Sequence, residues 1–207
     1  MKKYKLTEET KIHSGVTLYR IEALKDFAHV AAGDKGGWIA DEENLSRDGD
    51  AWVSCDAQVS GNALVSDDAQ VSSNAQVSGD AWVSGNAYVY GDAQVSGNAY
   101  VFGAAQVSGD ALVTGDAKVS GNAKVSGKAN ITLASHCLVI SPIGSERGEL
   151  TAYKTLEGIE ATRGCFSGTL EEFTKAVEET HGGNKHGKAY KAAIELIKIQ
   201  LSNEVNV

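Results

Sequence analysis

The sequence has few cysteines and no long apolar run. Its 207 residues include three cysteines, Cys55, Cys137 and Cys165, an odd number without a close pair. Free thiols in a reducing compartment fit this pattern better than a disulfide framework does. No stretch approaches the roughly 18 consecutive apolar residues of a transmembrane helix, and the polar N-terminus has no apolar signal-peptide core. We therefore expect a soluble, cytoplasmic protein that does not bind membranes.

The chain also lacks an excess of basic residues. It carries 27 Asp and Glu residues against 19 Lys and Arg residues, which gives a net charge of −8. A general nucleic-acid-binding protein needs a basic patch to neutralise phosphates, and no block of like charge marks a tail. We therefore expect no general nucleic-acid binding.

What the sequence does contain is a six-residue repeat of the form A-x-V-S-G-[D/N]. It runs for thirteen uninterrupted copies over residues 51–128. Ala fills the first position and Val the third in all thirteen, while Gly fills the fifth in ten and Asp or Asn the sixth in eleven. A fixed short period of this kind is typical of a solenoid.

The six positions have distinct physical roles. Alternation along A-x-V-S sends Ala and Val to one face of a short strand, and x and Ser to the other. Gly followed by Asp or Asn then turns the chain, because these residue types tolerate positive φ. A helix is disfavoured, because each Gly would cost it about 1 kcal/mol. The repeat therefore predicts a narrow coil with Ala and Val inside.

These hexads resemble the hexapeptide repeat of left-handed parallel β-helices, in which three hexads make one triangular coil of 18 residues. The resemblance implies a mainly β fold with Val residues such as Val53 stacked in its core. We predict a left-handed parallel β-helix over residues 51–134, an N-terminal β cap over residues 1–50 and a small C-terminal α+β domain over residues 135–207.

In that frame, sixth-position residues three hexads apart stack on one another. Asp56 would lie beside Asn74, and Asn62 beside Asp80. Two carboxylates at the inter-strand spacing of about 4.8 Å would repel by about 1 kcal/mol in water, and alternating Asp with Asn mostly avoids this. We interpret the sixth position as turn chemistry with charge avoidance, and expect no metal site and no cofactor.

Several outward positions of the repeat carry aromatic residues, which usually mark an interface. They are Trp82, Tyr88, Tyr90, Tyr100 and Phe102. Since left-handed β-helix proteins of this type are commonly homotrimers, the resemblance implies a homotrimer that uses these residues. A surface for a partner protein is the alternative.

The N-terminal block also resembles known sequences. A strand is predicted at residues 16–24, and segments 18–21, 36–38 and 44–46 read LYRI, GGW and NLS. This pattern resembles the opening of a group of bacterial and phage hexapeptide-repeat proteins.

The C-terminal block has a different texture. Strands are predicted at residues 136–145, 149–155 and 158–165, followed by a helix that a T-L-E-E capping box opens at Thr169 and a second helix over residues 188–201. Its GCFSGTLEEF and ETHGGNKH segments resemble a module that phage and prophage proteins attach to repeat scaffolds.

Residues 164–169 predict a loop of small residues that enters the first helix. Backbone N–H groups at a helix N-terminus favour an anion, so this loop could hold a phosphate or carboxylate with help from neighbouring turns. The candidate ligand-binding residues are Ser141, Ser145, Arg147, Arg163, Gly164, Cys165, Ser167, Gly168, Thr169, His181, Lys185, His186 and Tyr190. The alternative is an ordinary capped helix with solvated arginines, a polar interhelical loop and an inert Cys165 in place of a nucleophilic one.

The triangular prism that the stacked coils would form offers no catalytic base. Hexapeptide acyltransferases generally use a His between subunits, an acyl-CoA donor and a loop ejected from the coils. The thirteen hexads contain no His and no insertion, which leaves His29 and His136 as candidates and no catalytic residue that we would assign.

Three functions remain open. The one we prefer is a non-enzymatic oligomeric binding protein of phage origin, whose C-terminal module holds an anionic small molecule such as a nucleotide signal of host defence. The second is an acyltransferase that uses acyl-CoA. The third is a direct inhibitor of a host enzyme, with the acidic prism imitating nucleic acid.

Overall fold

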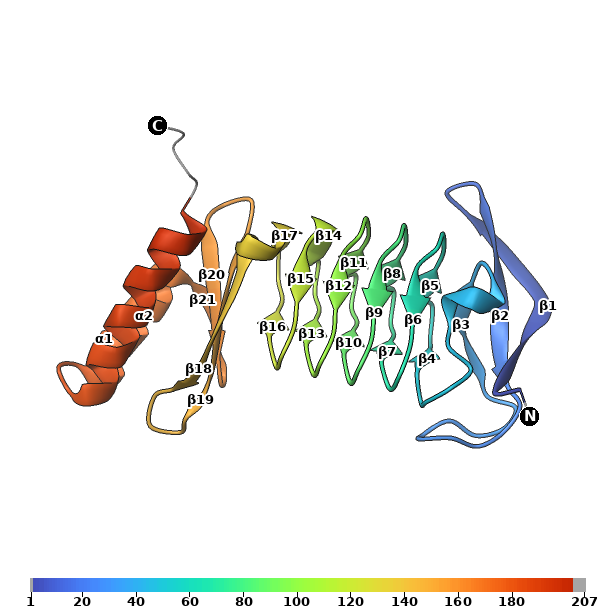
Figure 1. Cartoon of the computed structure of the whole chain (residues 1–207), viewed down its shortest axis with the longest axis horizontal. Coiled ribbons are helices and arrows are strands. Elements are labelled where there is room, and N and C mark those ends of the chain that lie inside the picture. Colours follow the sequence, from blue (N-terminus) through green and yellow to red (C-terminus); the bar gives the residue numbers. More distant parts are fainter. Residues whose placement is uncertain (1, 203–207) are drawn as a thin grey trace.

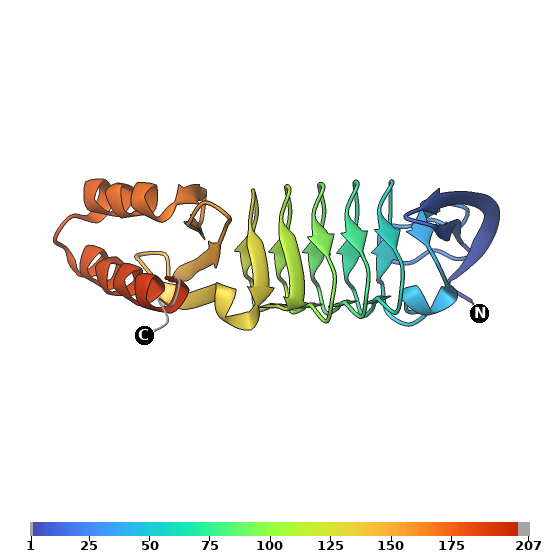
Figure 2. The ribbon, with the colours of Figure 1, turned by 90° about the horizontal axis from the view of Figure 1, so that it is seen from above.

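The computed structural model describes residues 2–202. Met1 and residues 203–207, which the predicted cap and C-terminal domain include, lie outside the described residues. The molecule is elongated, with a prism of parallel coils between an N-terminal sheet and a C-terminal pair of helices (Figures 1 and 2). Among the described residues, no helix is both long and apolar enough to cross a membrane.

The repeat forms fourteen short strands that wind around three faces of the prism. Face A holds β5 (Gln58–Val59), β8 (Gln76–Val77), β11 (Gln94–Val95), β14 (Leu112–Asp116) and β17 (Asn130–Leu133). Face B holds β4 (Trp52–Val53), β7 (Gln70–Val71), β10 (Tyr88–Val89), β13 (Gln106–Val107) and β16 (Lys124–Val125). Face C holds β6 (Leu64–Val65), β9 (Trp82–Val83), β12 (Tyr100–Val101) and β15 (Lys118–Val119).

Each strand pairs in parallel with the strand three hexads further along the chain. Gln58 lies opposite Gln76, and Trp82 lies opposite Tyr100. Fourteen strands over three faces make about five turns. The prediction of a parallel β-helix with an 18-residue coil is therefore confirmed.

The interior of the prism is as narrow as the repeat predicts. Every first-position Ala and third-position Val from Ala51 to Val125 is at most 1% exposed. The fifth position turns the chain with positive φ, as at Gly85 (φ 66°), and a Cβ there would lie 2.9 Å from the carbonyl oxygen of Gly103 in the next coil. Glycine is therefore favoured both by the backbone conformation and by the close approach of successive coils.

Sixth-position residues stack along the prism as predicted, and they do more than keep carboxylates apart. The side-chain amide of Asn62 donates to Asp80 at 2.8 Å, and that of Asn74 donates to Asp92 at 3.0 Å. At these two steps the Asp–Asn pair therefore adds a hydrogen bond between coils in place of a repulsion.

The N-terminal cap extends face A beyond the first coil. β1 (Tyr4–His13) pairs antiparallel with β2 (Val16–Ala23), which pairs with β3 (Lys35–Ile39), and β3 joins β5 in parallel. The predicted strand at residues 16–24 is confirmed as β2, whereas β1 was not predicted. The cap covers the outward ring of Trp52, which is 3% exposed and lies edge-on to Phe27 with 5.4 Å between ring centroids.

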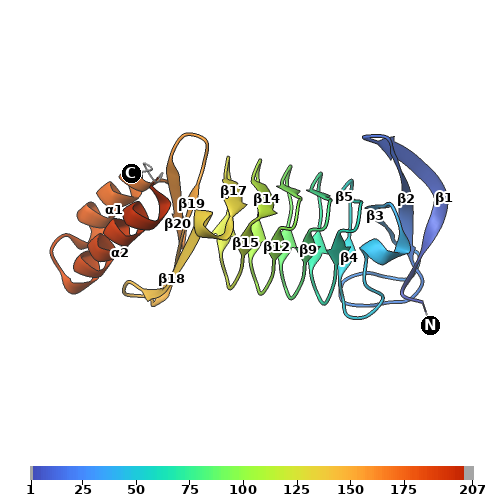
Figure 3. The ribbon, with the colours of Figure 1, turned by 45° about the horizontal axis from the view of Figure 1, so that its top comes forward.

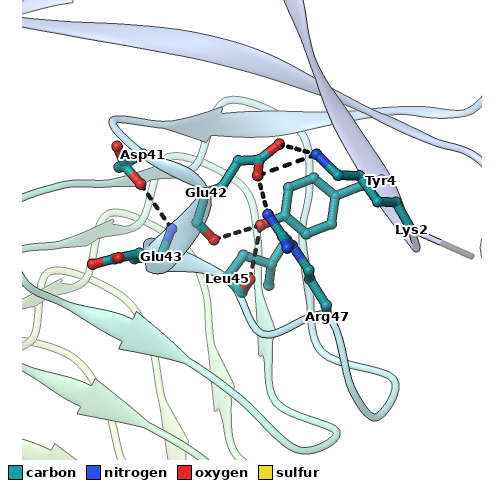
Figure 4. Close-up of polar contacts among 7 residues, drawn as sticks. All are labelled: Lys2, Tyr4, Asp41, Glu42, Glu43, Leu45 and Arg47. Carbon is teal, nitrogen blue, oxygen red and sulfur yellow. Dashed lines mark hydrogen bonds and ion pairs between the residues drawn. The ribbon is translucent and has the colours of Figure 1, made fainter.

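Side chains of the cap satisfy backbone groups at the open end of the prism. The amide of Asn44, in the short 3-10 helix η1 (Glu42–Asn44), donates to the carbonyls of Gly61 and Ala63. Figure 4 shows the neighbouring cluster, in which the Tyr4 hydroxyl contacts the carbonyls of Glu42 and Leu45 while Lys2 and Arg47 contact the Glu42 carboxylate. An open strand edge is thus closed by hydrogen bonds instead of being left for another chain.

The ammonium of Lys3 is the most deeply buried cation of the cap. It is 1% exposed and donates to the carbonyl of Ala51 at 2.9 Å. Burial lowers the pKa of Lys3 to about 8, although Asp50 opposes the shift. Between pH 8 and 10.5 the folded protein has therefore released a proton that the unfolded chain still holds, so Lys3 makes the protein more stable as the pH rises.

We expect the stability difference between the wild type and Lys3→Met to depend on pH. The free energy of unfolding of the wild type should gain up to about 3 kcal/mol relative to Lys3→Met between pH 8 and 10.5. Urea titrations of both proteins at half-unit pH steps measure this, and subtraction removes the contributions of tyrosines and cysteines. A difference that stays constant across the window would contradict the burial of this ammonium.

The C-terminal unit is a four-stranded antiparallel sheet with two helices on its outer face. The strands, in order, are β18 (Cys137–Ile143), β19 (Gly148–Lys154), β20 (Ile159–Arg163) and β21 (Phe166–Thr169), and a 3-10 helix η2 (Ala134–His136) precedes them. The helices are α1 (Leu170–His181) and α2 (Lys185–Leu201). Figure 3 shows the sheet between the last coil and the helices.

Alternate side chains of the sheet face opposite sides, so the sheet contacts both the helices and the last coil of the prism. Leu150 and Ala152 of β19 pack with the helices, while Thr151, between them, faces the prism. The Thr151 hydroxyl accepts from the backbone N–H of Lys124 at 3.1 Å, and the Thr162 hydroxyl donates to the Lys124 carbonyl at 2.8 Å. The last strand of face B is therefore capped by hydroxyl groups.

Two details of the C-terminal unit differ from the prediction. Residues 166–169 form a fourth strand, β21, instead of a loop, because they pair with β20 across a hairpin. The second helix begins at Lys185 instead of residue 188, because the Asn184 side chain caps it by accepting from the N–H groups of His186 and Gly187. The capping box at Thr169 is confirmed.

Candidate ligand-binding site

A hollow of about 280 Å³ opens between the C-terminal sheet and its two helices, and we call it the Arg163 hollow. The residues that line it are Ser145, Glu146, Arg163, Phe166, Phe173, Ala176, Val177, Thr180, His181 and Tyr190. They come from the β18–β19 turn, the end of β20, β21, one face of α1, and α2. The hollow therefore joins segments that lie up to 45 residues apart in the sequence.

The floor of the hollow is apolar and aromatic. Phe173, Val177 and His181 recur every four residues on α1 and so lie on one helix face. The Phe173 ring lies edge-on to Tyr190 at 5.7 Å, and His181 stacks on Tyr190 at 5.4 Å with an interplanar angle of 23°. A flat apolar or aromatic group fits such a floor.

Arg163 supplies the positive charge of the hollow. Alternation along β20 sends it to the helix side, and its side chain is only 12% exposed. Nη2 donates to the Ile143 carbonyl at 3.2 Å, and Nη1 lies 3.9 Å from the carboxylate of Glu146, which is 82% exposed. Nε is buried and has no hydrogen-bond partner among residues 2–202. Buried polar groups are normally hydrogen-bonded, so this guanidinium has unused capacity for an anionic partner.

Two glycines make room for these side chains. A Cβ at Gly148 would lie 2.7 Å from Nη1 of Arg163, and a Cβ at Gly144 would collide with the Tyr190 hydroxyl. The tight β18–β19 turn therefore brings backbone directly against the guanidinium and the phenol ring. This explains why that turn, which holds Ser145, lies at the rim of the hollow.

The structure brings together only part of the predicted ligand site. Ser145, Arg163, His181 and Tyr190 line the Arg163 hollow, and the ring centroid of His186 lies 6.1 Å from that of His181. The other candidates do not line this hollow. They are Ser141, Arg147, Gly164, Cys165, Ser167, Gly168, Thr169 and Lys185.

The prediction that residues 164–169 form a loop was wrong, because residues 166–169 pair with β20 as strand β21. Gly164 and Cys165 form the hairpin turn before β21, and the N-terminus of α1 is already occupied by its own carboxylate. Glu172 accepts from the N–H of Thr169 at 2.9 Å, and the Thr169 hydroxyl accepts from the N–H of Glu172. The positive end of this helix is thus satisfied within the chain.

Glu146, Phe166, Phe173 and Val177 were not predicted as site residues. The sequence assigned Phe173 and Val177 to the core face of α1, and they do belong to that core. Their four-residue spacing to His181 was the available signal that the same face also reaches a site.

The cysteines are free thiols, and the two histidines considered as catalytic bases, His29 and His136, lie outside the Arg163 hollow. Cys165 is exposed at the hairpin tip, whereas burial raises the pKa of Cys137 to about 12. His136 lines a separate hollow of about 550 Å³ beside Leu133 and Ile199, where burial lowers its pKa. His29 lies on the loop between β2 and β3.

The aromatic residues of the prism divide between two faces. On face C, the Tyr100 ring lies edge-on to Trp82 at 4.7 Å and to Phe102 at 5.2 Å, and we call these three residues the face C cluster. Tyr88 and Tyr90 lie on face B, and they are 46% and 39% exposed. The five candidates therefore form two patches instead of one continuous surface.

Comparison with known proteins places the repeat among solenoid sequences. The model of the YdcK beta solenoid repeat matches residues 57–73, 75–91, 93–106 and 105–119. A relative named "Uncharacterized acetyltransferase YdcK", from Escherichia coli (strain K12), is 39% identical over 61 residues, which cover 26% of this chain and 19% of that protein.

The chain is therefore a hexapeptide-type repeat protein, as its coils show. The alignment spans about a fifth of the YdcK relative, and the family model matches only hexads of the prism. The family-model match thus supports the scaffold, and the Arg163 hollow lies outside it.

Proposed function

We propose that this is a non-enzymatic binding protein whose Arg163 hollow holds a small molecule with both an anionic group and an aromatic ring. A nucleotide is the class that we favour, because it carries both parts. The observation that carries the proposal is the buried guanidinium of Arg163, whose Nε lacks a partner among residues 2–202 at the edge of an aromatic floor.

The residues divide the work of recognition. A phosphate or carboxylate would take the place of the exposed Glu146 carboxylate beside Arg163 and accept charge-assisted hydrogen bonds. A ring would lie against Phe173 and Tyr190, with the imidazole of His181 at its edge. The prism and its caps would hold this site on a rigid support.

The terminal sequences resemble phage proteins, which favours a phage origin. In that setting the protein would sequester a nucleotide signal of host defence. Sequestration requires tight stoichiometric binding without turnover, which agrees with a site built from an arginine and aromatic rings.

Native mass spectrometry tests this proposal on protein purified from its expression host. We expect intact protein to be heavier than denatured protein by a few hundred daltons, or empty protein to take up one equivalent of AMP per chain. Protein that is empty and also fails to bind AMP, ADP and cyclic AMP at millimolar concentration would overturn the proposal.

The face C cluster supports self-association, and we propose a homotrimer packed through it. Trp82 is 38% exposed and Phe102 is 36% exposed, and their contacts with Tyr100 make them one contiguous aromatic patch, which is typical of an interface. The polar sixth position is also replaced at Ala104, two residues beyond Phe102 on the corner between faces C and B.

Trp82→Arg is expected to dissociate this trimer. Removing a central Trp from an interface typically costs 2 kcal/mol or more, so the dissociation constant should rise by roughly 30-fold or more. Size-exclusion chromatography with light scattering measures the mass, and Gln94→Arg on face A is the matched control. A wild type that is monomeric, or a Trp82→Arg trimer of unchanged stability, would contradict the role of face C.

The acyltransferase alternative has one observation in its favour. The YdcK relative is named an acetyltransferase, and His136 lines a hollow of about 550 Å³. If this alternative holds, acetyl-CoA should raise the melting temperature of the wild type but not of His136→Ala.

The third alternative is inhibition of a host enzyme by an acidic prism that imitates nucleic acid. It predicts partner binding that weakens as the salt concentration rises.

A further inference from the structure

Two further hollows share lining residues with the Arg163 hollow or with each other. A second hollow of about 210 Å³ lies on the prism side of the sheet, and Arg163 lines it as well. A third of about 260 Å³ lies against face B beneath the β20–β21 hairpin. Lys124 lines both of these, and Phe166 lines both the first and the third. The three hollows therefore adjoin one another around the end of β20.

We propose that the ligand is extended and carries two anionic groups, with one at Arg163 and the other at Lys124 on the prism. A dinucleotide has this chemistry, with two phosphates and two bases. This inference rests on the proposed function, since it assigns the ligand class of the same site and adds a second subsite on face B.

Lys124 is fixed at the second and third hollows, where its ammonium can contact a second anionic group. Its backbone N–H and carbonyl are bonded to Thr151 and Thr162, which fixes the residue against the C-terminal sheet. Its side chain is exposed, and within the described chain no carboxylate lies at ion-pair distance from its ammonium. The nearby Glu149 is engaged by the backbone and side-chain amides of Asn122 at 3.3 and 3.0 Å. The ammonium of Lys124 is therefore available to an anion.

Tyr90 offers a stacking surface in the third hollow. It stands at the fourth hexad position, which holds Ser in the neighbouring face B strands at Ser72, Ser108 and Ser126. Tyr90 is 39% exposed, and Ser108 and Ser126 line the same hollow. Because its neighbours are small, one face of the Tyr90 ring is free, and a nucleotide base can stack on such a face.

The two subsites have the same character, a cation beside aromatic rings. The Arg163 hollow offers a cation beside the rings of Phe173 and Tyr190, and the third hollow, against face B, offers Lys124 beside Tyr90. A mononucleotide would fill only the first of these subsites. A dinucleotide would fill both, and the second contact would be made without a second loss of translational freedom.

Isothermal titration with AMP and with the linear dinucleotide pApA tests this inference. We expect the wild type to bind pApA at least about 10-fold more tightly than AMP, because base stacking and a phosphate contact are added. Lys124→Ala and Tyr90→Ala should each weaken pApA binding by about 10-fold and leave AMP binding unchanged. Lys118→Ala, at the equivalent outward position on face C, is the control and should change neither affinity.

Each outcome separates this inference from the proposed function. Equal affinities for AMP and pApA, or pApA binding that is insensitive to both face B variants, overturns the second subsite while the Arg163 hollow stands. Failure of AMP and pApA alike to bind the wild type overturns both. Melting temperatures of the variants verify folding, and they should match the wild type because both altered side chains are exposed.

Discussion

Arg163→Ala should weaken AMP binding by about 10- to 100-fold, because a charge-assisted hydrogen bond contributes roughly 1.5–3 kcal/mol. The guanidinium is the cation of the hollow, and its buried Nε has no partner in the described part of the chain. Isothermal titration measures the change. Arg147→Ala is the matched control, because this exposed turn arginine does not line the hollow and its loss should leave the affinity unchanged.

Two further variants test the same site in case Arg163→Ala weakens binding only because it unfolds the C-terminal unit. Glu146→Gln should tighten AMP binding, because it removes a carboxylate that lies 3.9 Å from Nη1 of Arg163. Gly148→Ala should also weaken binding, because the added Cβ would displace the guanidinium, while the backbone at Gly148 does not have positive φ and can accept Ala. If Arg163→Ala and Arg147→Ala bind AMP equally well, the anion is not held at this hollow.

Val95→Asp is expected to prevent folding of the prism. Val95 is 0% exposed in a stack between Val77 and Val113. The new carboxyl would have no hydrogen-bond partner there, which costs about 2–7 kcal/mol in addition to the lost Val packing. This sum is comparable to the total stability of a typical domain, about 5–15 kcal/mol.

Gln94→Asp is the matched control for the core variant, because Gln94 precedes Val95 in β11 but is exposed on face A. Its effect on stability should stay within about 0.5 kcal/mol. Circular dichroism during urea unfolding measures both variants. A Val95→Asp protein that unfolds at the wild-type urea concentration would contradict the inward stacking of Val.

The prism could be predicted from the sequence because local and global requirements agree in every hexad. Ala and Val recur at the inward positions of every hexad, and most turns follow directly from Gly with Asp or Asn, so no long-range information was needed. The 18-residue coil even predicted the neighbours of Asn62 and Asn74.

The ends of the chain were less predictable, because their structure depends on distant partners. β1 reads YKLTEETKIH, in which six of ten residues are charged or Thr, and it becomes a strand by pairing with β2. β21 reads FSGT, a short segment whose Gly disfavours a strand, and the hairpin with β20 holds it in place. In both strands the pairing partner outweighs the local preference.

Some residues of the candidate site could be predicted from their type, but the contacts that depend on distant pairing could not. Arg163, His181 and Tyr190 stand out as charged or aromatic residues in a small unit, and they do meet. Residues 164–168, however, belong to the hairpin of β20 and β21 instead of the helix N-terminus, and no local sequence pattern predicted this pairing. The packing of α1 against α2, which places His181 on Tyr190, also lies beyond a single-sequence pattern.

The central claim is that the Arg163 hollow binds a nucleotide, and amide chemical-shift mapping with AMP tests it most directly. We expect saturable shifts confined to the amides of residues 144–148, 163–166, 173–181 and 186–190, with the prism faces far from the hollow unchanged. Shifts that cluster elsewhere, or an absence of saturable shifts up to millimolar AMP, would contradict it.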